Sequence, residues 1–270
     1  MAEIELNGLK FHYQITGEGQ EWLIYLHGLV MDNLSSGYFT LAQSLKAYRL
    51  CLYDLRGHGL SSRPKSNYRI EDHVADLYAL IQELILKNTL SPPKITLIGI
   101  SFGGLIAMAF AQKYPQHCQS IILIEAHLFH QTFKEKMIHT LQLEGEARSE
   151  MIAKNFEHWI GRHQPRRRQK MAERASELVY ETTLIEDLEK SEMVDAKSIE
   201  GLVCDILALY GTKSDAIDSA NLLKAHAKNL DLIWFDDCSH AILWEKTTEV
   251  TASILNFLSA KHQSSPSSLL

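Results

Sequence analysis

A serine, Ser101, stands at the centre of the stretch Leu-Ile-Gly-Ile-Ser-Phe-Gly-Gly-Leu at residues 97–105, with glycines two positions before and after it, Gly99 and Gly103. The run before the serine is apolar and strand-like, and the run after it has the composition of a helix, so almost no residues remain for the connection. Glycines beside so abrupt a turn let neighbouring backbone approach where a Cβ would clash. The pattern predicts a strained strand-to-helix turn that exposes the Ser101 hydroxyl at a helix N-terminus, where developing negative charge is favoured.

A serine hydroxyl is a weak nucleophile unless a base takes its proton and an acid orients that base. Asp215 lies just after a later strand-like run, and His240 lies in the loop after the last such run. Both should lie at the same edge of a parallel sheet as Ser101, so the three side chains can converge. Asp218 and Glu125 are rival acids, and a simple helix N-cap is the alternative role for Ser101.

The elements that position these residues follow from the spacing of apolar side chains. Short runs that are apolar on both faces belong to strands covered on both sides, and here they alternate with segments of helical spacing. The chain therefore predicts an α/β fold with a mainly parallel sheet between layers of helices. A tight hairpin is expected at Asn7 and Gly8. The expected strands span 22–27, 49–54, 94–99, 120–125, 205–211 and 230–236, and the expected helices span 39–47, 71–87, 102–114, 217–228 and 247–260.

Residues 127–200 interrupt this alternation. They are rich in charged residues and methionine and contain no convincing strand-like run, which predicts a helical insertion over one edge of the sheet. The expected organisation is a first part of the core at 1–126, a helical cap at 127–200, a second part of the core at 201–262 and a disordered polar tail at 263–270.

Composition narrows the classes of partner. The net charge of -6 gives no general attraction to nucleic acid or to anionic membranes. The four cysteines are scattered, which is typical of reduced thiols rather than of a disulfide framework. No secretion signal and no apolar run of about 18 residues is found, so a cytoplasmic protein is expected. Nothing in the sequence matches a metal-binding pattern, and no cofactor is expected.

Five sequence landmarks follow one another along the chain, namely LHG at 26–28, DLRGHGLS at 54–61, GISFGG at 99–104, YGTKSD at 210–215 and CSHAILWE at 238–245. With these landmarks in this order, the chain resembles the cap-bearing α/β-hydrolase superfamily over nearly its whole length. The G-x-S-x-G arrangement around Ser101 is similar to the nucleophile elbow of that superfamily. The resemblance implies that Ser101 is the nucleophile, His240 the general base and then acid, and Asp215 the group that orients His240. It also implies an oxyanion hole formed by the backbone N–H groups of Leu29 and Phe102.

The same resemblance indicates the reaction. A serine at the nucleophile position argues against halide and epoxide substrates, because the corresponding relatives need aspartate there. Cleavage of an ester or thioester through an acyl-serine intermediate is the leading interpretation, and a lyase, a cyclase or a ligand receptor of the same fold are the alternatives. A largely apolar pocket would suit a hydrophobic acyl or aromatic small molecule. The residues expected in or beside this pocket are His27, Gly28, His127, Leu128, Phe129, Trp159 and Trp244.

Other polar segments have a structural interpretation as the first choice. Asp54 and Arg56 are expected to form salt bridges or hydrogen bonds within their loop, and His73 is expected at the surface. The basic run at 162–174 is expected to be a solvated helix face, with docking of an acyl-carrier protein or a substrate phosphate as the alternative.

Overall fold

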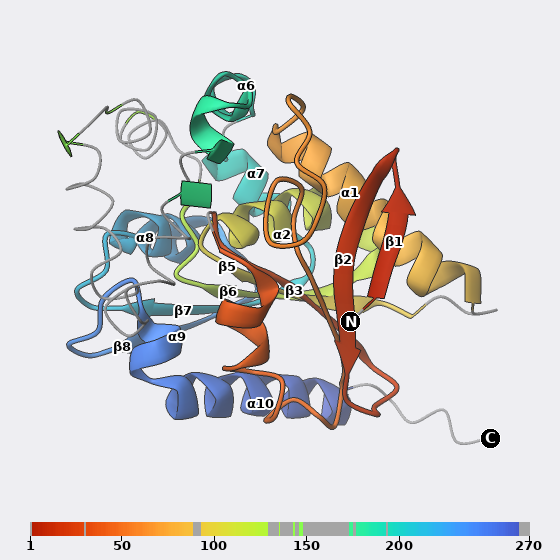
Figure 1. Ribbon diagram of the computed structural model, residues 1–270. Coiled ribbons are helices and arrows are strands. Elements are labelled where there is room, and N and C mark those ends of the chain that lie inside the picture. The colour runs from red at the N-terminus through yellow and green to blue at the C-terminus, as the bar shows by residue number, and fades with distance from the viewer. Residues whose placement is uncertain are drawn as a thin grey trace.

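The centre of the molecule is an eight-stranded sheet with the strand order β1-β2-β4-β3-β5-β6-β7-β8 (Figure 1). The structure is a computed structural model. It describes residues 2–29, 31–88, 93–128, 135, 143, 146–147, 173–174, 177–192 and 194–264.

The chain begins with the predicted hairpin. Strands β1 (Ala2–Leu6) and β2 (Leu9–Thr16) pair antiparallel, with Leu6 opposite Leu9. Asn7 and Gly8 between them have φ values of 51° and 74°. Positive φ at both central residues is what a two-residue turn needs to match the twist of its strands, and Asn-Gly adopts it readily.

The remaining strands form the predicted parallel part of the sheet. β2 pairs antiparallel with β4, and every other pairing from β4 through β3, β5, β6 and β7 to β8 is parallel. The carboxyl ends of these strands therefore share one edge of the sheet, as the sequence predicts. The strands are β3 (Trp22–Leu26), β4 (Arg49–Tyr53), β5 (Ile95–Ile100), β6 (Cys118–Ile124), β7 (Asp205–Gly211) and β8 (Leu230–Phe235).

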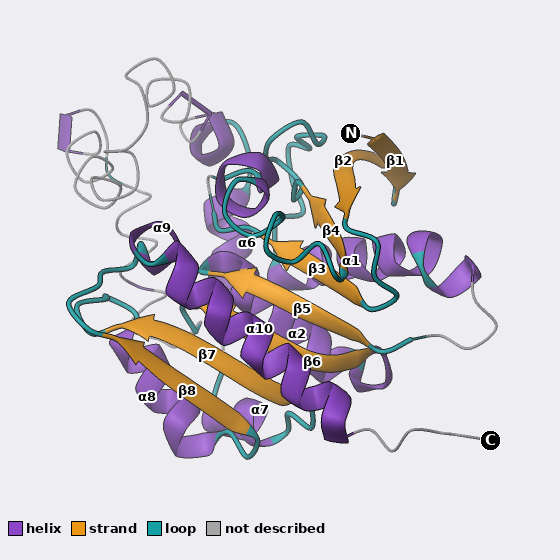
Figure 2. Ribbon diagram, turned by 90° about the horizontal axis from the view of Figure 1, so that it is seen from below, coloured by secondary structure: helices purple, strands orange, loops and turns teal. Residues whose placement is uncertain are grey.

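Helices cover both faces of the sheet (Figures 1 and 2). On one face, α1, α2 and α8 pack with the strands into a large apolar cluster. On the opposite face, α9 and α10 enclose a second cluster, and Figure 2 shows α10 lying across the strands. The helices are α1 (Ile70–Leu84), α2 (Phe102–Lys113), α6 (Leu184–Lys190), α7 (Ala196–Glu200), α8 (Ile217–His226), α9 (Ile242–Glu245) and α10 (Thr247–Ser264), with short segments η1 (Leu34–Tyr38), η2 (Leu86–Asn88) and η3 (Pro115–His117).

The predicted helix at 39–47 is wrong. A π-helix, η1, ends at Tyr38 and is followed by successive turns rather than by a continuous α-helical ladder. Leu41 and Leu45 are nevertheless fully buried, and the N–H of Leu45 donates to the carbonyl of Leu41. The apolar spacing at these positions therefore indicates the buried face correctly, but a chain of turns produces the same spacing as a helix.

The predicted cap can be followed only in part. Among the described residues between 129 and 200, regular structure is helical, as in α6, α7 and residues 177–180. Most of 129–176 lies outside the described residues, so the cap and its boundaries stay predictions. At the other end of the chain, α10 extends to Ser264 and so takes in the first two residues of the predicted tail.

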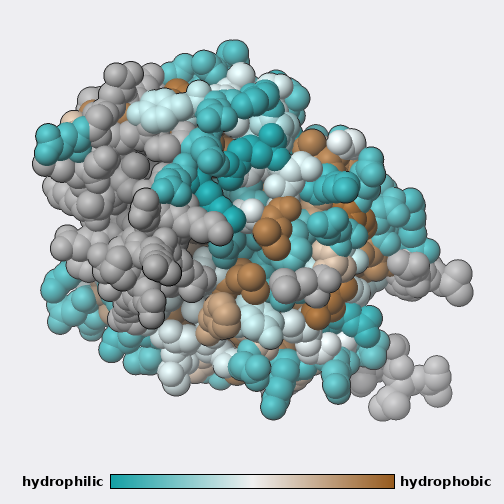
Figure 3. All heavy atoms as spheres, in the orientation of Figure 1, coloured by the Kyte–Doolittle hydropathy of each residue, from teal (hydrophilic) through white to brown (hydrophobic). Residues whose placement is uncertain are grey.

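The surface shown in Figure 3 is mostly hydrophilic, with hydrophobic side chains in small groups separated by polar ones. No helix in the described part of the chain combines the length and the apolar character needed to cross a membrane. The large apolar side chains that are exposed among the described residues are Ile15, Phe39, Leu60, Tyr180 and Val203.

The loop after β4 is held by buried charges. Leu60 contacts Asp54 within the loop, as predicted, but the salt bridge of Arg56 reaches Asp76 in α1 rather than staying within the loop. The Asp54 carboxylate accepts hydrogen bonds from the backbone and side chain of Asn33 and from the N–H of Leu60. Arg56 forms a bidentate pair with Asp76 of α1, at 2.6 and 2.7 Å. Both partners of this pair are buried, and Asn7 of the first hairpin donates a further hydrogen bond to Asp76. The pair therefore links the β4 loop, α1 and the hairpin.

We expect Asp76→Ala to lower the free energy of unfolding by about 3–5 kcal/mol, because it leaves the buried Arg56 guanidinium without its partner. Urea unfolding followed by circular dichroism measures the change. The control is Glu181→Ala, which breaks the exposed pair with Lys65 and should cost less than about 1 kcal/mol. Equal effects of the two substitutions would contradict the structural role assigned to the buried pair.

Candidate active site

Ser101 occupies the turn between β5 and α2, with φ of 50° and ψ of -115°. A positive φ is unfavourable for a serine and persists only where the surrounding structure holds it. The N–H of Ser101 donates to the carbonyl of Ile124 at the end of β6, and the Ser101 carbonyl accepts from the N–H of Gly104. The side chain makes no capping hydrogen bond to the helix, so the geometry differs from that of a plain N-cap.

The glycines around this turn allow close packing of backbone on backbone. A Cβ at Gly99 would lie 2.5 Å from the carbonyl oxygen of Gly103, and a Cβ at Gly103 would lie 2.1 Å from the carbonyl oxygen of Leu26 in β3. Side-chain carbons do not approach other atoms so closely. The glycine spacing predicts close packing of backbone at this turn. The structure has this packing, since the first turn of α2 lies directly against the ends of two strands.

Two backbone N–H groups beside Ser101, those of Leu29 and Phe102, have no hydrogen-bond acceptor among the described residues. Phe102 begins α2, so its N–H has no acceptor within the helix. The N–H of Leu29 donates no hydrogen bond to any other described residue. A Cβ at Gly28 would lie 3.4 Å from the Cβ of Ser101, which places the loop with Leu29 next to the serine. Both predicted donors are thus brought to one place.

His27 supports this loop from within the core. Its Nδ1 contacts the carbonyl oxygen of Gly28 at 2.8 Å, and its Nε2 accepts the N–H of Leu55 at 2.9 Å. Burial lowers the pKa of the His27 imidazole, in keeping with a neutral ring that donates from one nitrogen and accepts at the other. The side chain is fully buried, so His27 holds the loop rather than facing a substrate.

Asp215 and His240 come together at the same edge of the sheet. The Nδ1 atom of His240 lies 3.3 Å from the Oδ1 atom of Asp215 and 3.5 Å from the Oε2 atom of Glu125. Both are ion-pair distances, and neither contact has the geometry of a full hydrogen bond. The predicted acid and a predicted rival therefore both face one imidazole nitrogen, whereas Asp218 lies in the first turn of α8.

His127 completes what we call the acid–imidazole cluster, namely Glu125, His127, Asp215 and His240. Its Nε2 atom lies 3.3 Å from the Oδ1 atom of Asp215. The rings of His127 and His240 stack with centroids 4.8 Å apart. His127, which the sequence analysis expects in or beside the substrate pocket, is almost fully buried, at 6% exposure. The Oδ1 atom of Asp215 thus lies within ion-pair distance of both imidazoles, His127 and His240.

The loops that carry Asp215 and His240 are fixed to each other. Gly211 at the end of β7 has no room for a Cβ, which would lie 2.3 Å from the carbonyl oxygen of Cys238. The same carbonyl accepts the N–H of Lys213 at 2.8 Å. On the other side of His240, the hydroxyl and the N–H of Ser239 both donate to Glu245 of α9. The relative position of acid and imidazole is therefore set by backbone contacts.

The charges of the cluster shift the pKa values of His240 and Asp215. Burial works against the protonated His240, but the contacts with Asp215 and Glu125 and their negative charges outweigh it and raise its pKa to about 9. Partial burial likewise works against an ionised Asp215, whose side chain is 51% exposed, yet its contacts with His127 and His240 hold the pKa of that carboxyl well below its usual range. The cluster therefore favours the protonated form of His240 and the ionised form of Asp215.

No hydrogen bond joins the Ser101 hydroxyl to His240 among the contacts of the described residues. Because Nδ1 of His240 faces the two acids, Nε2 is the nitrogen available to the serine. Such contacts are commonly long without a bound substrate and shorten when one binds.

The remaining predicted pocket residues are placed differently from one another. The fully buried Leu128 donates its N–H to the hydroxyl of Ser219 at 2.9 Å. Trp244 lies in α9 and packs on the apolar cluster of the α10 face. Phe129, Trp159 and residues 162–172 of the basic run lie outside the described residues.

His73 is a correction to the expectation of a surface residue. It lies in α1, is 1% exposed, and neither ring nitrogen has a hydrogen-bond partner among the described residues. Its ring stands perpendicular to that of Phe102, with centroids 5.2 Å apart. His73 thus supports the residue that carries one of the two N–H donors. Its spacing from the buried Ile70 and Leu77 is the sequence signal that could have placed it on the inner face of α1.

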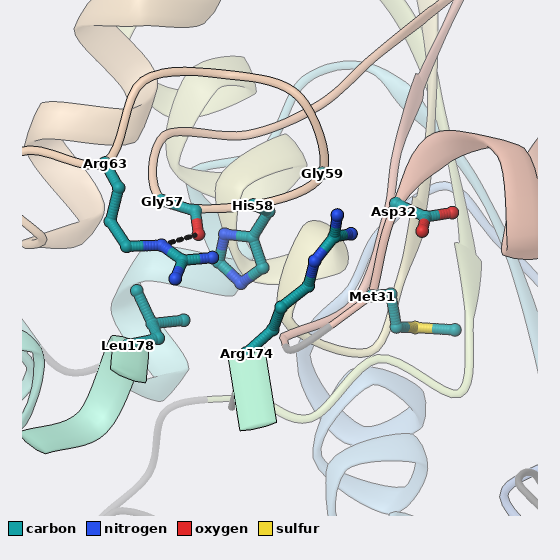
Figure 4. Close-up of a pocket in the computed structure, with 8 residues that line it drawn as sticks. All are labelled: Met31, Asp32, Gly57, His58, Gly59, Arg63, Arg174 and Leu178. Carbon is teal, nitrogen blue, oxygen red and sulfur yellow. Dashed lines mark hydrogen bonds between the residues drawn. The ribbon is translucent and has the colours of Figure 1, made fainter. Parts of the chain in front are cut away.

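A pocket opens beside the Gly28 loop (Figure 4). It is partly lined by charged side chains and includes none of Ser101, Asp215 and His240, so the predicted pocket beside the serine stays a prediction. Arg63 donates to the carbonyl of Gly57 and pairs with Glu177, whereas Arg174 reaches across the opening in Figure 4. The lining residues are Met31, Asp32, Gly57, His58, Gly59, Arg63, Arg174 and Leu178.

Three members of the cluster also have donor atoms close enough to hold a metal ion. Those of His127, Asp215 and His240 all lie within 4.8 Å of one another. In this structure the same atoms form the ion pairs described above, so a metal would have to displace those pairs.

Comparison with known proteins gives a match to a family model described as the alpha/beta hydrolase fold, over residues 21–247. A cis-3-alkyl-4-alkyloxetan-2-one decarboxylase of Shewanella oneidensis is 31% identical over 128 residues, or 46% of this chain and 38% of the relative. A proline iminopeptidase, PfmaB, of Pestalotiopsis fici is 35% identical over 123 residues, or 44% of this chain and 42% of the relative. The matched stretch spans less than half the length of either curated relative.

A solved structure resembles nearly the whole chain. The enol-lactonase from Burkholderia xenovorans LB400 superposes with a TM-score of 0.74 at 20% identity, covering 96% of this chain and 100% of that one. At this level of identity the likeness shows a shared fold.

We expect the stabilising effect of His240 to depend on pH. Its pKa is raised from 6.5 to about 9 in the folded protein, so its contribution should be complete below about pH 6.5 and lost as the pH rises to about 9. His240→Gln should therefore cost more free energy of unfolding at pH 6 than at pH 9.5, as measured by urea titration at each pH. The same cost at both values would contradict a raised pKa.

Proposed function

Because the chain belongs to the alpha/beta hydrolase fold family, we propose that it is a serine hydrolase cleaving an ester or thioester of a hydrophobic small molecule. Ser101 is the nucleophile, His240 the general base and then acid, and Asp215 an acid that orients His240. The backbone N–H groups of Leu29 and Phe102 form the oxyanion hole. The reaction proceeds through an acyl-serine intermediate and needs no cofactor.

The observation that carries the proposal is the turn at Ser101. Ser101 has φ of 50° and lies next to two N–H groups without acceptors among the described residues. The strain is accounted for if the turn exposes a nucleophile beside donors for the negative charge that its attack creates.

The proposed steps use these groups in sequence. The Ser101 oxygen attacks the carbonyl carbon while Nε2 of neutral His240 takes the hydroxyl proton, and the carbonyl oxygen becomes an oxyanion bound by the two N–H groups. Collapse of this intermediate breaks the bond to the alcohol or thiol, which leaves with the proton from His240. A water molecule, deprotonated by the same imidazole, then hydrolyses the acyl-serine and restores the hydroxyl.

The apolar and partly exposed Leu29 beside the serine supports a hydrophobic acyl or aromatic substrate. Leu29 and Phe102 flank the proposed oxyanion hole, and both pack into the apolar cluster that contains α2. The enol-lactonase found among the structural neighbours is in keeping with ester cleavage on this fold.

Replacement of the nucleophile gives the direct test. We expect Ser101→Ala to reduce kcat for hydrolysis of short p-nitrophenyl acyl esters by on the order of 10³-fold or more and to abolish labelling by a fluorophosphonate probe. The matched control is Ser253→Ala in α10, on the other face of the sheet, which should keep both properties.

Undiminished hydrolysis by a pure Ser101→Ala protein would overturn the proposal. Mass spectrometry of the products separates the alternatives for the same residues. Addition of water supports a hydrolase, whereas an isomeric product indicates a cyclase.

A further inference from the structure

Glu125 is a fully buried acid at the end of β6, directly beneath the proposed catalytic residues. Its backbone has φ of 51°, an unfavourable value for a glutamate. The N–H of Glu125 donates to the carbonyl of Leu209 in the neighbouring strand β7. The chain therefore turns sharply at this residue and sends its side chain toward the end of β7.

Both oxygens of the Glu125 side chain are held there. Oε1 accepts the N–H of Gly211 at 2.5 Å, and Oε2 accepts the hydroxyl of Ser214. The Ser214 oxygen in turn accepts the N–H of Ala216, which leaves its proton for Glu125. These donors come from the loop that carries Asp215, so the buried acid and the exposed acid belong to one hydrogen-bonded unit.

The held carboxylate faces the imidazole. Its Oε2 atom lies 3.5 Å from Nδ1 of His240, compared with 3.3 Å for Oδ1 of Asp215. The difference of 0.2 Å between these two contacts does not make either acid the sole partner. Glu125 differs in its surroundings, because it is shielded from water, whereas the side chain of Asp215 is 51% exposed. Interactions of a shielded charge are screened less.

Asp215 also contacts a second imidazole, that of His127. The same Oδ1 atom that faces His240 lies 3.3 Å from Nε2 of His127. Its negative charge is therefore divided between two imidazoles, and water competes for it. Glu125 has no other imidazole within ion-pair distance among the described residues.

From this geometry we infer that Glu125 is a second acid of the proposed catalytic machinery, a positioning residue that orients His240 and stabilises its imidazolium together with Asp215. The inference rests on the proposed function. It implies that both acids are needed for the full orientation of His240 and the full stabilisation of its imidazolium.

The experiment compares Asp215→Asn, Glu125→Gln and the double variant in the full chain. With one acid, replacing it costs about 10⁴-fold in kcat. With two, we expect Asp215→Asn to lose about 10- to 10²-fold and the double variant to approach the 10⁴-fold loss. Glu125→Gln should lower the apparent pKa of the base in the pH profile of kcat/KM, because the charge is lost while the amide can still accept from Gly211.

A matched control separates charge from loop position. Ser214→Ala removes one hydrogen bond to Glu125 but leaves its charge, so the apparent pKa of His240 should stay near the wild-type value. If Ser214→Ala lowers this pKa as far as Glu125→Gln does, Glu125 acts only by holding the loop and the inference is wrong. A 10⁴-fold loss in Asp215→Asn alone, with an unchanged pH profile in Glu125→Gln, would also overturn it.

A second measurement does not depend on turnover. NMR titration of the His240 ring in wild type and Glu125→Gln should show a lower pKa in the variant, and an unchanged pKa contradicts the inference. This readout is distinct from failure of the proposed function, which would appear as hydrolysis that survives Ser101→Ala. Thermal unfolding of each variant confirms that a folded protein is being titrated.

Discussion

The close approach of α2 to the ends of β3 and β5 is the constraint on which the candidate site depends. The backbone of Gly103 lies so near the carbonyl of Leu26 that a Cβ there would be 2.1 Å from the oxygen. Only this approach brings the N–H of Phe102 and the loop of Leu29 to the same side of Ser101. The positive φ of Ser101 is the local cost of that packing, offset by the apolar area that α2 buries on the sheet.

Parallel strand order then decides which side chains reach the serine. β5, β6, β7 and β8 are neighbours in the sheet and end at one edge, so the residues that follow them are gathered there despite the long insertion between β6 and β7. Because β6 lies between β5 and β7, the acid at its end lies between the serine and the loop of Asp215. The presence of two acids at one imidazole follows from this order, together with the turn at Glu125.

The sequence predicts those parts of the molecule that local rules control. Strands covered on both faces are apolar throughout, so β3 and β5 could be recognised directly, and the glycines around Ser101 indicate a turn that needs them. Residues 39–47 show the limit, since buried side chains at helical spacing do not distinguish a helix from successive turns. The spacing of His73 indicates the buried face of α1, but its contact with Phe102 and the contacts of the two acids depend on tertiary structure. A sequence can name Glu125 and Asp215 as rivals, but only the fold shows that both face His240.

For a histidine base between two acids, a higher proton affinity comes with a smaller fraction of the neutral form that can accept a proton. The negative charges that raise the pKa of His240 to about 9 make its neutral form a better proton acceptor but reduce the fraction of that form at neutral pH. Once the proton has moved, the same negative charges are favourable, because they stabilise the imidazolium that is created during attack. Rigid placement of Glu125 favours this later stage, since a carboxylate already held by Gly211 and Ser214 needs no rearrangement as the charge develops.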